Sequence, residues 1–187
     1  ADAWTNDLLG HLGTRFNLRT TLEQVAYHRP GDASLGAPDR FPVWIWMDDP
    51  SFYGIPAFDA GEPKIGQDAG GAETTGDTRS FETDPAYSAR LDRFVAEHLP
   101  GVHGPVVREL TCLYVMPPDR EFVCDRVPGH ERAFVFQGAA HAYKFAGIFG
   151  RSLAELSLGF AVKADLAPFS ATRPCLTEPD PDWNALI

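Results

Sequence analysis

The chain has 187 residues, 44% of them hydrophobic, so it can bury a sizeable core and we expect a globular fold. Its formal net charge of −10 at pH 7 argues against a surface that binds nucleic acid or an anionic membrane, because both need clustered Lys and Arg. Three widely spaced cysteines predict neither a disulfide framework nor a metal site, and no apolar run approaches the ~18 residues of a membrane span, so we expect a cytoplasmic protein.

The first half of the chain predicts a short helix followed by strands. Apolar residues recur at helical spacing over 4–12, and Gly13 ends this segment. Residues 21–29 and 42–47 predict two strands. The Gly- and Thr-rich residues 69–80 predict an exposed loop.

A longer amphipathic helix is predicted to begin after Asp84. Aspartate is a favourable N-cap residue, and Pro85 suits the first helical turn. The apolar residues up to Leu99 fall on one face, and Pro100 follows the helix. The charged residues between them indicate a solvated face without chemistry.

Residues 106–116 predict a strand, because they are β-branched or apolar and are followed by two prolines. Alternation places Leu110, Cys112, Tyr114 and Met116 on one face of this strand. Without further context, a cysteine at such a position is most often a small buried hydrophobe.

A second strand is predicted at 133–137, and it runs directly into Gly138 and a helix that carries apolar residues at helical spacing. Lys144 lies near the start of that helix, where the macrodipole disfavours a cation. This position makes sense if an anion or a carbonyl-rich ligand shares the site. Farther on, residues 160–162 indicate a short strand.

Four motifs follow one another in the second half of the chain. They are Cys112-Leu113-Tyr114, a Pro118-Asp119 turn, Phe122-Val123-x-Asp125 and Gly138-x-x-His141-x-Tyr143-Lys144-Phe145. Together they resemble the family of monomeric sarcosine oxidase and N-methyltryptophan oxidase, which are FAD-dependent amine oxidases of the D-amino-acid-oxidase group, and the resemblance is to their C-terminal half. It implies an α/β (α+β) fold, with residues 1–16 and 117–187 in an FAD-binding domain and a mostly antiparallel substrate domain over 17–116.

The family's Gly-x-Gly-x-x-Gly turn, which holds the FAD pyrophosphate at a helix N-terminus, does not occur in these 187 residues. We therefore expect an upstream segment or a second chain to carry the dinucleotide-binding fold. The alternative is a non-catalytic fragment or partner subunit that is inactive without such a chain.

The resemblance implies that FAD is attached covalently at Cys112, through a thioether to the 8α carbon of the flavin. Tyr114, on the same strand face, would then lie near the working edge of the ring. Cys124 and Cys175 have no comparable context, and we interpret both as structural.

The resemblance also implies that the segment after the second strand approaches the flavin. Gly138, Ala140 and Ala142 are small, as a close approach of the chain to the ring would require, and His141 stands among them. Lys144 would bind the carboxylate of an amino-acid substrate and the carbonyls of the flavin.

Three residues of the predicted substrate domain complete the implied site. Tyr53 matches a family tyrosine that borders the substrate, and Lys64 matches the lysine that promotes the reaction with oxygen, where a cation stabilises the developing superoxide. Asp68 replaces a histidine of the relatives and favours a cationic substrate group. The neighbouring aromatic residues either line an amine pocket or, as their pattern favours, form the core of a half-buried sheet; they are Trp44, Trp46, Phe52 and Phe58.

The implied function is the oxidation of a secondary or N-methyl amine of amino-acid type to an imine, with O₂ reduced to H₂O₂. Bound FAD would supply the redox chemistry.

Overall fold

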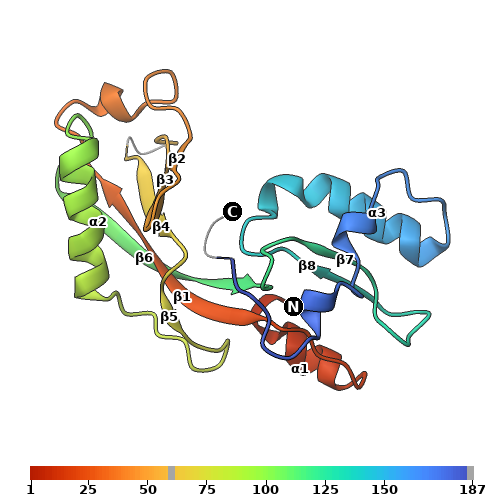
Figure 1. The fold of residues 1–187 in the computed structure, drawn as a ribbon. Helices are drawn as coiled ribbons and strands as arrows, with labels where there is room; N and C mark the ends of the chain where they lie inside the picture. The colour runs from red at the N-terminus through yellow and green to blue at the C-terminus, as the bar shows by residue number, and fades with distance from the viewer. Residues whose placement is uncertain (59–61, 185–187) are drawn as a thin grey trace. The chain divides into compact units, whose positions relative to one another are not determined.

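The computed structural model describes residues 1–58 and 62–184, and the chain forms two compact units (Figure 1). Unit 1 consists of Ala1–Thr20, Thr75–Asp77 and Leu113–Ile187, and unit 2 of Thr21–Thr74 and Thr78–Cys112. Within the described residues, no helix is long and apolar enough to cross a membrane. The assignment of an FAD-binding and a substrate domain to parts of this chain stays a prediction.

The larger sheet lies mainly in unit 2. Its strand order is β2-β3-β4-β1-β5, and β6 also pairs with β1. The ladders of β1 with β4 and β5, of β2 with β3 and of β3 with β4 are all antiparallel. The expected α/β (α+β) fold with an antiparallel sheet is therefore confirmed. The strands are β1 (Arg19–His28), β2 (Trp44–Trp46), β3 (Ser51–Ile55), β4 (Lys64–Asp68), β5 (Ala72–Glu73) and β6 (Val106–Met116).

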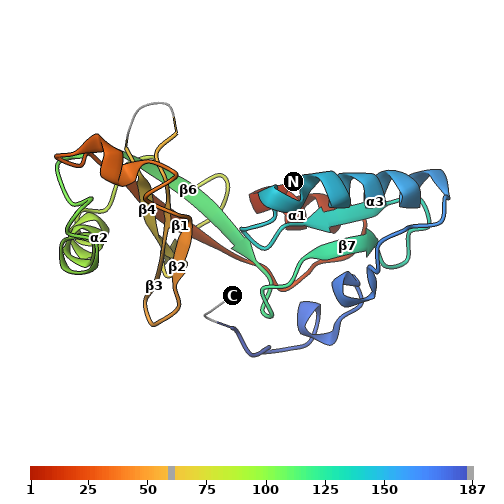
Figure 2. The same cartoon turned by 90° about the horizontal axis from the view of Figure 1, so that it is seen from above.

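Helix α2 (Pro85–His98) covers one face of this sheet, as Figures 1 and 2 show. The Asp84 side chain accepts a hydrogen bond from the Ala86 N–H and caps the helix as predicted. The ring of Phe94 stacks on that of Phe52 with 3.9 Å between their centres. The core of unit 2 is made of Ala26, Phe41, Phe52, Ile65, Leu91, Phe94, Val95 and Val102.

Strands β3 and β4 are not evident in the sequence, because each carries a glycine in its interior. A Cβ on Gly54 would lie 2.3 Å from Nε1 of Trp44, and a Cβ on Gly66 would lie 3.0 Å from the ring of Tyr53. The two glycines therefore let aromatic rings lie flat against the sheet. Of the aromatic cluster, Phe52 is buried and Phe58 is exposed, so the sheet-core interpretation holds for only part of it.

Unit 1 contains an antiparallel hairpin of β7 (Val123–Arg126) and β8 (Phe134–Gln137). Helix α3 (Ala146–Leu158) packs along it, and the short helix α1 (Thr5–Gly10) lies at its other side (Figure 1). Two clusters form the core. One comprises Phe122, Cys124, Ala139, Ala142 and Phe149, and the other comprises Leu9, Phe16, Val123, Val127, Val135, Ala171 and Leu176.

The strand predicted at residues 160–162 is wrong, because Phe160 belongs to the end of α3. Gly159 has a φ of 72°, and the Phe160 N–H donates to the Glu155 carbonyl at 2.8 Å. The Gly159 N–H donates to the Leu156 carbonyl, which completes a Schellman motif. The chain then continues through two short 3-10 turns, Ala167–Phe169 and Pro174–Leu176.

Candidate functional site

Three of the predicted site residues share the face of the sheet opposite to α2. In the ladder between β3 and β4, Tyr53 lies opposite Gly66 and Asp68 lies opposite Ser51. Side chains alternate along a strand, and Phe52 and Ile65 are buried in the core beneath α2. Tyr53, Lys64 and Asp68 therefore point to the other face.

Tyr53 and Lys64 contact each other on this face. The ammonium nitrogen of Lys64 lies 5.7 Å from the centre of the Tyr53 ring, at the distance of a cation–π interaction. The Tyr53 ring rests on Gly66, and Lys64 is partly buried. Lys64 is thus the first residue of an interior strand and not a solvated loop charge.

Cys112 belongs to the same face. Glu109 accepts hydrogen bonds from Gln24 and from Ser88 of α2, so it points to the helix-covered side of β6. Arg108 lies on the opposite side, with its guanidinium 3.8 Å from the centre of the Tyr27 ring. Alternation along β6 places Cys112 with Arg108, and its thiol is partly exposed.

The other two cysteines have structural surroundings. Cys124 is fully buried, and burial, together with the nearby Asp125, raises the pKa of its thiol to about 11. The Cys175 thiol donates a hydrogen bond to Asp119 at 3.1 Å, and burial raises its pKa as well. Neither is a reactive thiolate, which leaves Cys112 as the cysteine best suited to covalent chemistry.

In unit 1, the residues after β8 form a tight turn. The His141 N–H donates to the Gly138 carbonyl at 3.0 Å, and the two residues between them, Ala139 and Ala140, have φ values of 46° and 71°. A Cβ on Gly138 would lie only 2.8 Å from the Cβ of Ala142, so this position requires glycine. The small residues singled out in the sequence therefore form the turn itself.

His141 and Lys144 are held together by this turn. The Lys144 ammonium donates to the His141 carbonyl at 2.7 Å and lies 3.4 Å from the Nδ1 of the same residue. The His141 ring packs on Phe122, with 4.8 Å between ring centres. This arrangement presents one imidazole and one exposed ammonium side by side.

Lys144 lies near the start of the helix, as expected, but just before its first residue. Lys144 lies in the 3-10 turn Tyr143–Phe145, and α3 begins at Ala146. Its ammonium already has a carbonyl acceptor, so the helix dipole alone does not call for an external anion. Its third proton is left for another acceptor when His141 Nδ1 accepts the second one.

The predicted residues divide between the two units. Tyr53, Lys64, Asp68 and Cys112 lie in unit 2, and Tyr114, Gly138, Ala140, His141, Ala142 and Lys144 lie in unit 1. Tyr114, partly buried, follows Cys112 by two positions on β6.

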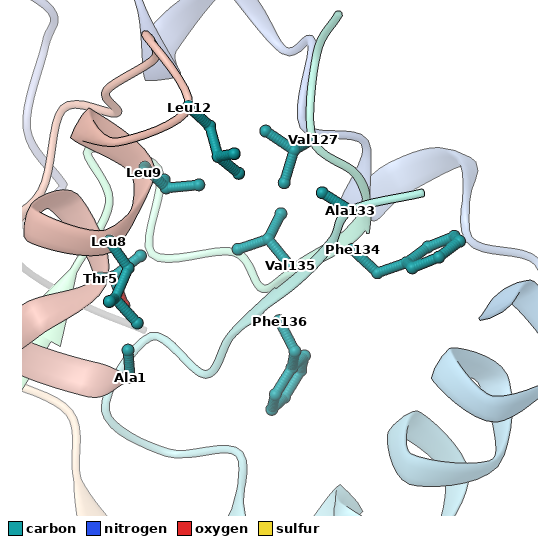
Figure 3. Close-up of a pocket in the computed structure, with 10 residues that line it drawn as sticks. All are labelled: Ala1, Thr5, Leu8, Leu9, Leu12, Val127, Ala133, Phe134, Val135 and Phe136. Atoms are coloured by element: carbon teal, nitrogen blue, oxygen red, sulfur yellow. The ribbon is translucent and has the colours of Figure 1, made fainter. Parts of the chain in front are cut away.

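Sequence reasoning missed two cavities. In unit 1, a cavity of about 190 Å³ lies between α1 and the hairpin, and Figure 3 shows its apolar lining by Leu8, Leu9 and Val135. The Thr5 hydroxyl beside it is buried without a hydrogen-bond partner. In unit 2, a cavity of about 340 Å³ is lined by residues that include Glu23, Tyr87 and Arg90. The only sequence signal near the first cavity is the group of leucines within residues 8–12.

Comparison with known proteins decides the family. The family described as FAD dependent oxidoreductase matches residues 1–156, most of the chain. The chain belongs to this family.

Among the described residues, no group of His, Cys, Asp and Glu is arranged to hold a metal ion.

Similar members of the FAD dependent oxidoreductase family confirm the resemblance seen in the motifs. Human peroxisomal sarcosine oxidase is 34% identical over 185 residues, which is 92% of this chain and 46% of that protein. Monomeric sarcosine oxidase of Bacillus sp. (strain NS-129) is 28% identical over 93% of this chain and 46% of that protein. N-methyl-L-tryptophan oxidase of Salmonella newport (strain SL254) is 31% identical over 76% of this chain and 39% of that protein.

Solved structures of the family show the same fold. NikD, an amino acid oxidase essential for nikkomycin biosynthesis, superimposes with a TM-score of 0.72 at 26% identity, over 90% of this chain and 46% of NikD. Glycine oxidase from Geobacillus kaustophilus gives a TM-score of 0.75 at 19% identity, over 92% of this chain and 44% of that protein. The chain thus spans about half the length of the relatives that it matches.

Proposed function

We propose that this chain forms one half of an FAD-dependent oxidase of secondary or N-methyl amines of amino-acid type. The relatives named for sarcosine and N-methyl-L-tryptophan act on N-methyl amino acids, which supports this substrate class. The observation that carries the proposal is the sheet face of unit 2, where Cys112, Lys64 and Tyr53 stand on one side of β6, β4 and β3.

When bound, FAD would supply the redox chemistry by accepting one hydride equivalent, which is two electrons and a proton, from the amine, and O₂ would be the final acceptor of the two electrons and would give H₂O₂. The substrate carbon next to nitrogen loses the hydride, the nitrogen loses a proton, and the resulting imine is hydrolysed by water.

The residues of the chain fit this cofactor. Cys112, a partly exposed residue, would hold FAD covalently through a thioether between Sγ and the 8α carbon. Forming this thioether would remove one proton from the thiol, one proton from the carbon and two electrons, and O₂ would accept the electrons. The fit rests on the contrast with Cys124, whose thiol is buried in the core. Tyr114, two positions beyond Cys112, would lie at the edge of the ring.

Lys64 would act on oxygen. Its ammonium faces the Tyr53 ring, which leaves its charge available to stabilise superoxide as the first electron is transferred. Tyr53 and Asp68 would border the substrate, where the Asp68 carboxylate favours a second cationic group on the amine. His141 and Lys144 would contact FAD, and Lys144 would bind the substrate carboxylate.

An upstream segment or a second chain would supply the dinucleotide-binding fold. The absence of the Gly-x-Gly-x-x-Gly turn from the sequence supports this part of the proposal, and so does the apolar cavity beside α1 with its unpartnered Thr5 hydroxyl (Figure 3). The other candidate function, a non-catalytic partner subunit, is favoured by the same missing turn.

The test is to locate flavin on the protein. The holoprotein is precipitated with acid, digested, and its peptides are mapped by absorbance and mass. We expect yellow colour on the peptide that contains Cys112 and loss of that colour in Cys112→Ser, with Cys124→Ser as the matched control. Release of all flavin into the supernatant would show that attachment at Cys112 is wrong. Absence of any flavin, together with no H₂O₂ from N-methyl amino acids, would favour the non-catalytic subunit.

A further inference from the structure

The turn after β8 is fastened by the side chain of Gln137. Gln137 ends β8 and is only 2% exposed. Its Oε1 accepts a hydrogen bond from the Ala139 N–H at 2.6 Å, and its Nε2 donates to the Val115 carbonyl at 2.9 Å. One buried amide therefore ties the turn to the end of β6, within unit 1.

The turn needs such a fastening because of its backbone. Ala139 and Ala140 both lie in the left-handed region, with φ values of 46° and 71°. This region is unfavourable for alanine, since its Cβ approaches the following carbonyl oxygen. Consecutive residues of this kind persist only where their surroundings impose the conformation, and they cluster at functional sites. Ala139 is fully buried in the core beside Phe122, but Ala140 is not, so packing restrains only the first of them.

The turn positions His141 and Lys144, and this role explains why its unfavourable backbone conformation is tolerated. The hydrogen bond from His141 to Gly138 closes the turn, and the Lys144 ammonium donates to the carbonyl of His141. A change in the turn would therefore displace both of these side chains. Both polar atoms of the Gln137 amide are engaged in these hydrogen bonds, so its side chain holds the turn in place.

We propose that Gln137 is a positioning residue of the flavin site, whose amide holds the left-handed turn in the shape that presents His141 and Lys144 to FAD. This proposal rests on the proposed function, because the assignment of His141 and Lys144 to FAD gives the turn its ligand.

The experiment compares Gln137→Leu with a matched control, Gln67→Leu. Leucine has nearly the volume of glutamine and makes no hydrogen bond, so Gln137→Leu removes both ties. Gln67 is also buried, and its amide donates to the Ala69 carbonyl and accepts from Arg90, but it lies in unit 2. Each protein also carries Cys112→Ser, so that FAD binds without covalent attachment and its affinity can be measured. Each is examined by amide hydrogen exchange of residues 139–141 and by titration with FAD, followed by the flavin absorbance, with the dinucleotide-binding half present.

In Gln137→Leu, we expect faster exchange at Ala139 and His141 and FAD binding weakened about tenfold or more, the scale of one lost buried hydrogen bond. Gln67→Leu should change neither. Adding Ala140→Gly to Gln137→Leu should restore most of the affinity, because glycine adopts the left-handed conformation without being held there. If Gln137→Leu does not fold, Gln137→Met, which also removes both hydrogen bonds but keeps an unbranched side chain, takes its place, and the same loss is expected.

Unchanged exchange in these variants would overturn the proposal, and so would faster exchange with unchanged FAD affinity. A loss of affinity that Ala140→Gly does not restore would also overturn it, since the loss would then not come from the turn. Failure of the unaltered protein to bind FAD would be a different result: it would overturn the proposed function, and it would appear in the wild type before any variant is compared.

Discussion

At the scale of single residues, the strand on which a side chain stands decides what it can do. Lys64 looks like a loop lysine in the sequence, flanked by proline and glycine, yet it begins an interior strand and faces the ring of Tyr53. A cation held against an aromatic face has fewer orientations than a solvated one. Such a fixed charge can stabilise a transition state without reorganising.

Lys64→Met should slow the reoxidation of reduced flavin by O₂ about 10²-fold or more, the scale on which one preplaced electrostatic group is lost. Anaerobic reduction by the amine should hardly change. Stopped-flow absorbance measures both half-reactions, and Lys163→Met, which removes an exposed lysine, serves as the control. Slower reduction with normal reoxidation would contradict the role of Lys64 in the oxygen reaction.

The titration of His28 should make the free energy of unfolding of unit 2 depend on pH. It is fully buried, its Nε2 has no hydrogen-bond partner, and its Nδ1 lies 3.3 Å from the Gly104 carbonyl. Burial lowers the pKa of His28 below its ordinary value of 6.5, and the hydrogen bond to Gly104 opposes this only in part. The folded state therefore holds a neutral imidazole at a pH where the unfolded chain begins to bind a proton.

The sign of the effect follows from this difference. Below pH 6.5 the unfolded chain binds more protons at this site than the folded one. The contribution of His28 to the free energy of unfolding is therefore greatest above that pH and decreases as the pH is lowered. We expect urea midpoints at pH 5.5 to be lower than at pH 7.5, and His28→Gln to reduce this difference. His11→Gln, at an exposed position, should leave it intact. Equal pH dependence in wild type and His28→Gln would contradict the expectation.

At the scale of elements, helix α2 shows how local sequence signals and packing agree. Asp84 caps it, Pro85 begins it, and the apolar stripe of the sequence is the face that packs on the sheet.

Asp84→Ala should therefore lower the free energy of unfolding by ~1 kcal/mol, the usual value of an N-cap. Chemical denaturation measures this, and Glu97→Ala on the exposed side of the same helix is the control. A change at Asp84 no larger than that at Glu97 would show that the cap contributes nothing.

The elements that sequence reasoning found and those that it missed differ in one respect. Helix α2 and strand β6 have long uninterrupted patterns, and both were predicted. Strands β3 and β4 are short and contain Gly54 and Gly66. These glycines leave room for aromatic rings that come from other positions along the chain. The apolar residues after Leu158 suggested a strand, but Gly159 and Phe160 serve to end a helix.

The candidate site follows the same division. Motifs identified Cys112, His141 and Lys144, because their spacing is distinctive along the chain. They gave no sign of Gln137, whose two hydrogen bonds depend on how β6 and β8 are arranged in space. Alternation alone placed Cys112 on a strand face, but only the contacts of Glu109 and Arg108 show which face that is.

At the scale of the whole molecule, each of the two units has its own core, and predicted site residues occur in both. We expect the chain alone to fold but to bind FAD weakly, because it lacks the turn that holds the pyrophosphate. Addition of a purified dinucleotide-binding half from a relative should raise the affinity for FAD by a large factor, and flavin fluorescence measures it. If the chain alone binds FAD as tightly as the chain with the added half does, the missing turn is dispensable for FAD binding.

The two glycines of β3 and β4 have a consequence for how this sequence can diverge. Gly54 receives an indole on the core side of the sheet, and Gly66 receives the phenol ring of Tyr53 on the other side. Any side chain at Gly54 would push Trp44 out of a packed interior, so lineages that carry such a change should lose solubility first. A side chain at Gly66 would instead lift Tyr53 away from Lys64 while the core stays intact. Under the proposed function, natural variation at Gly66 would therefore alter the neighbourhood of Tyr53 and Lys64 without refolding the sheet.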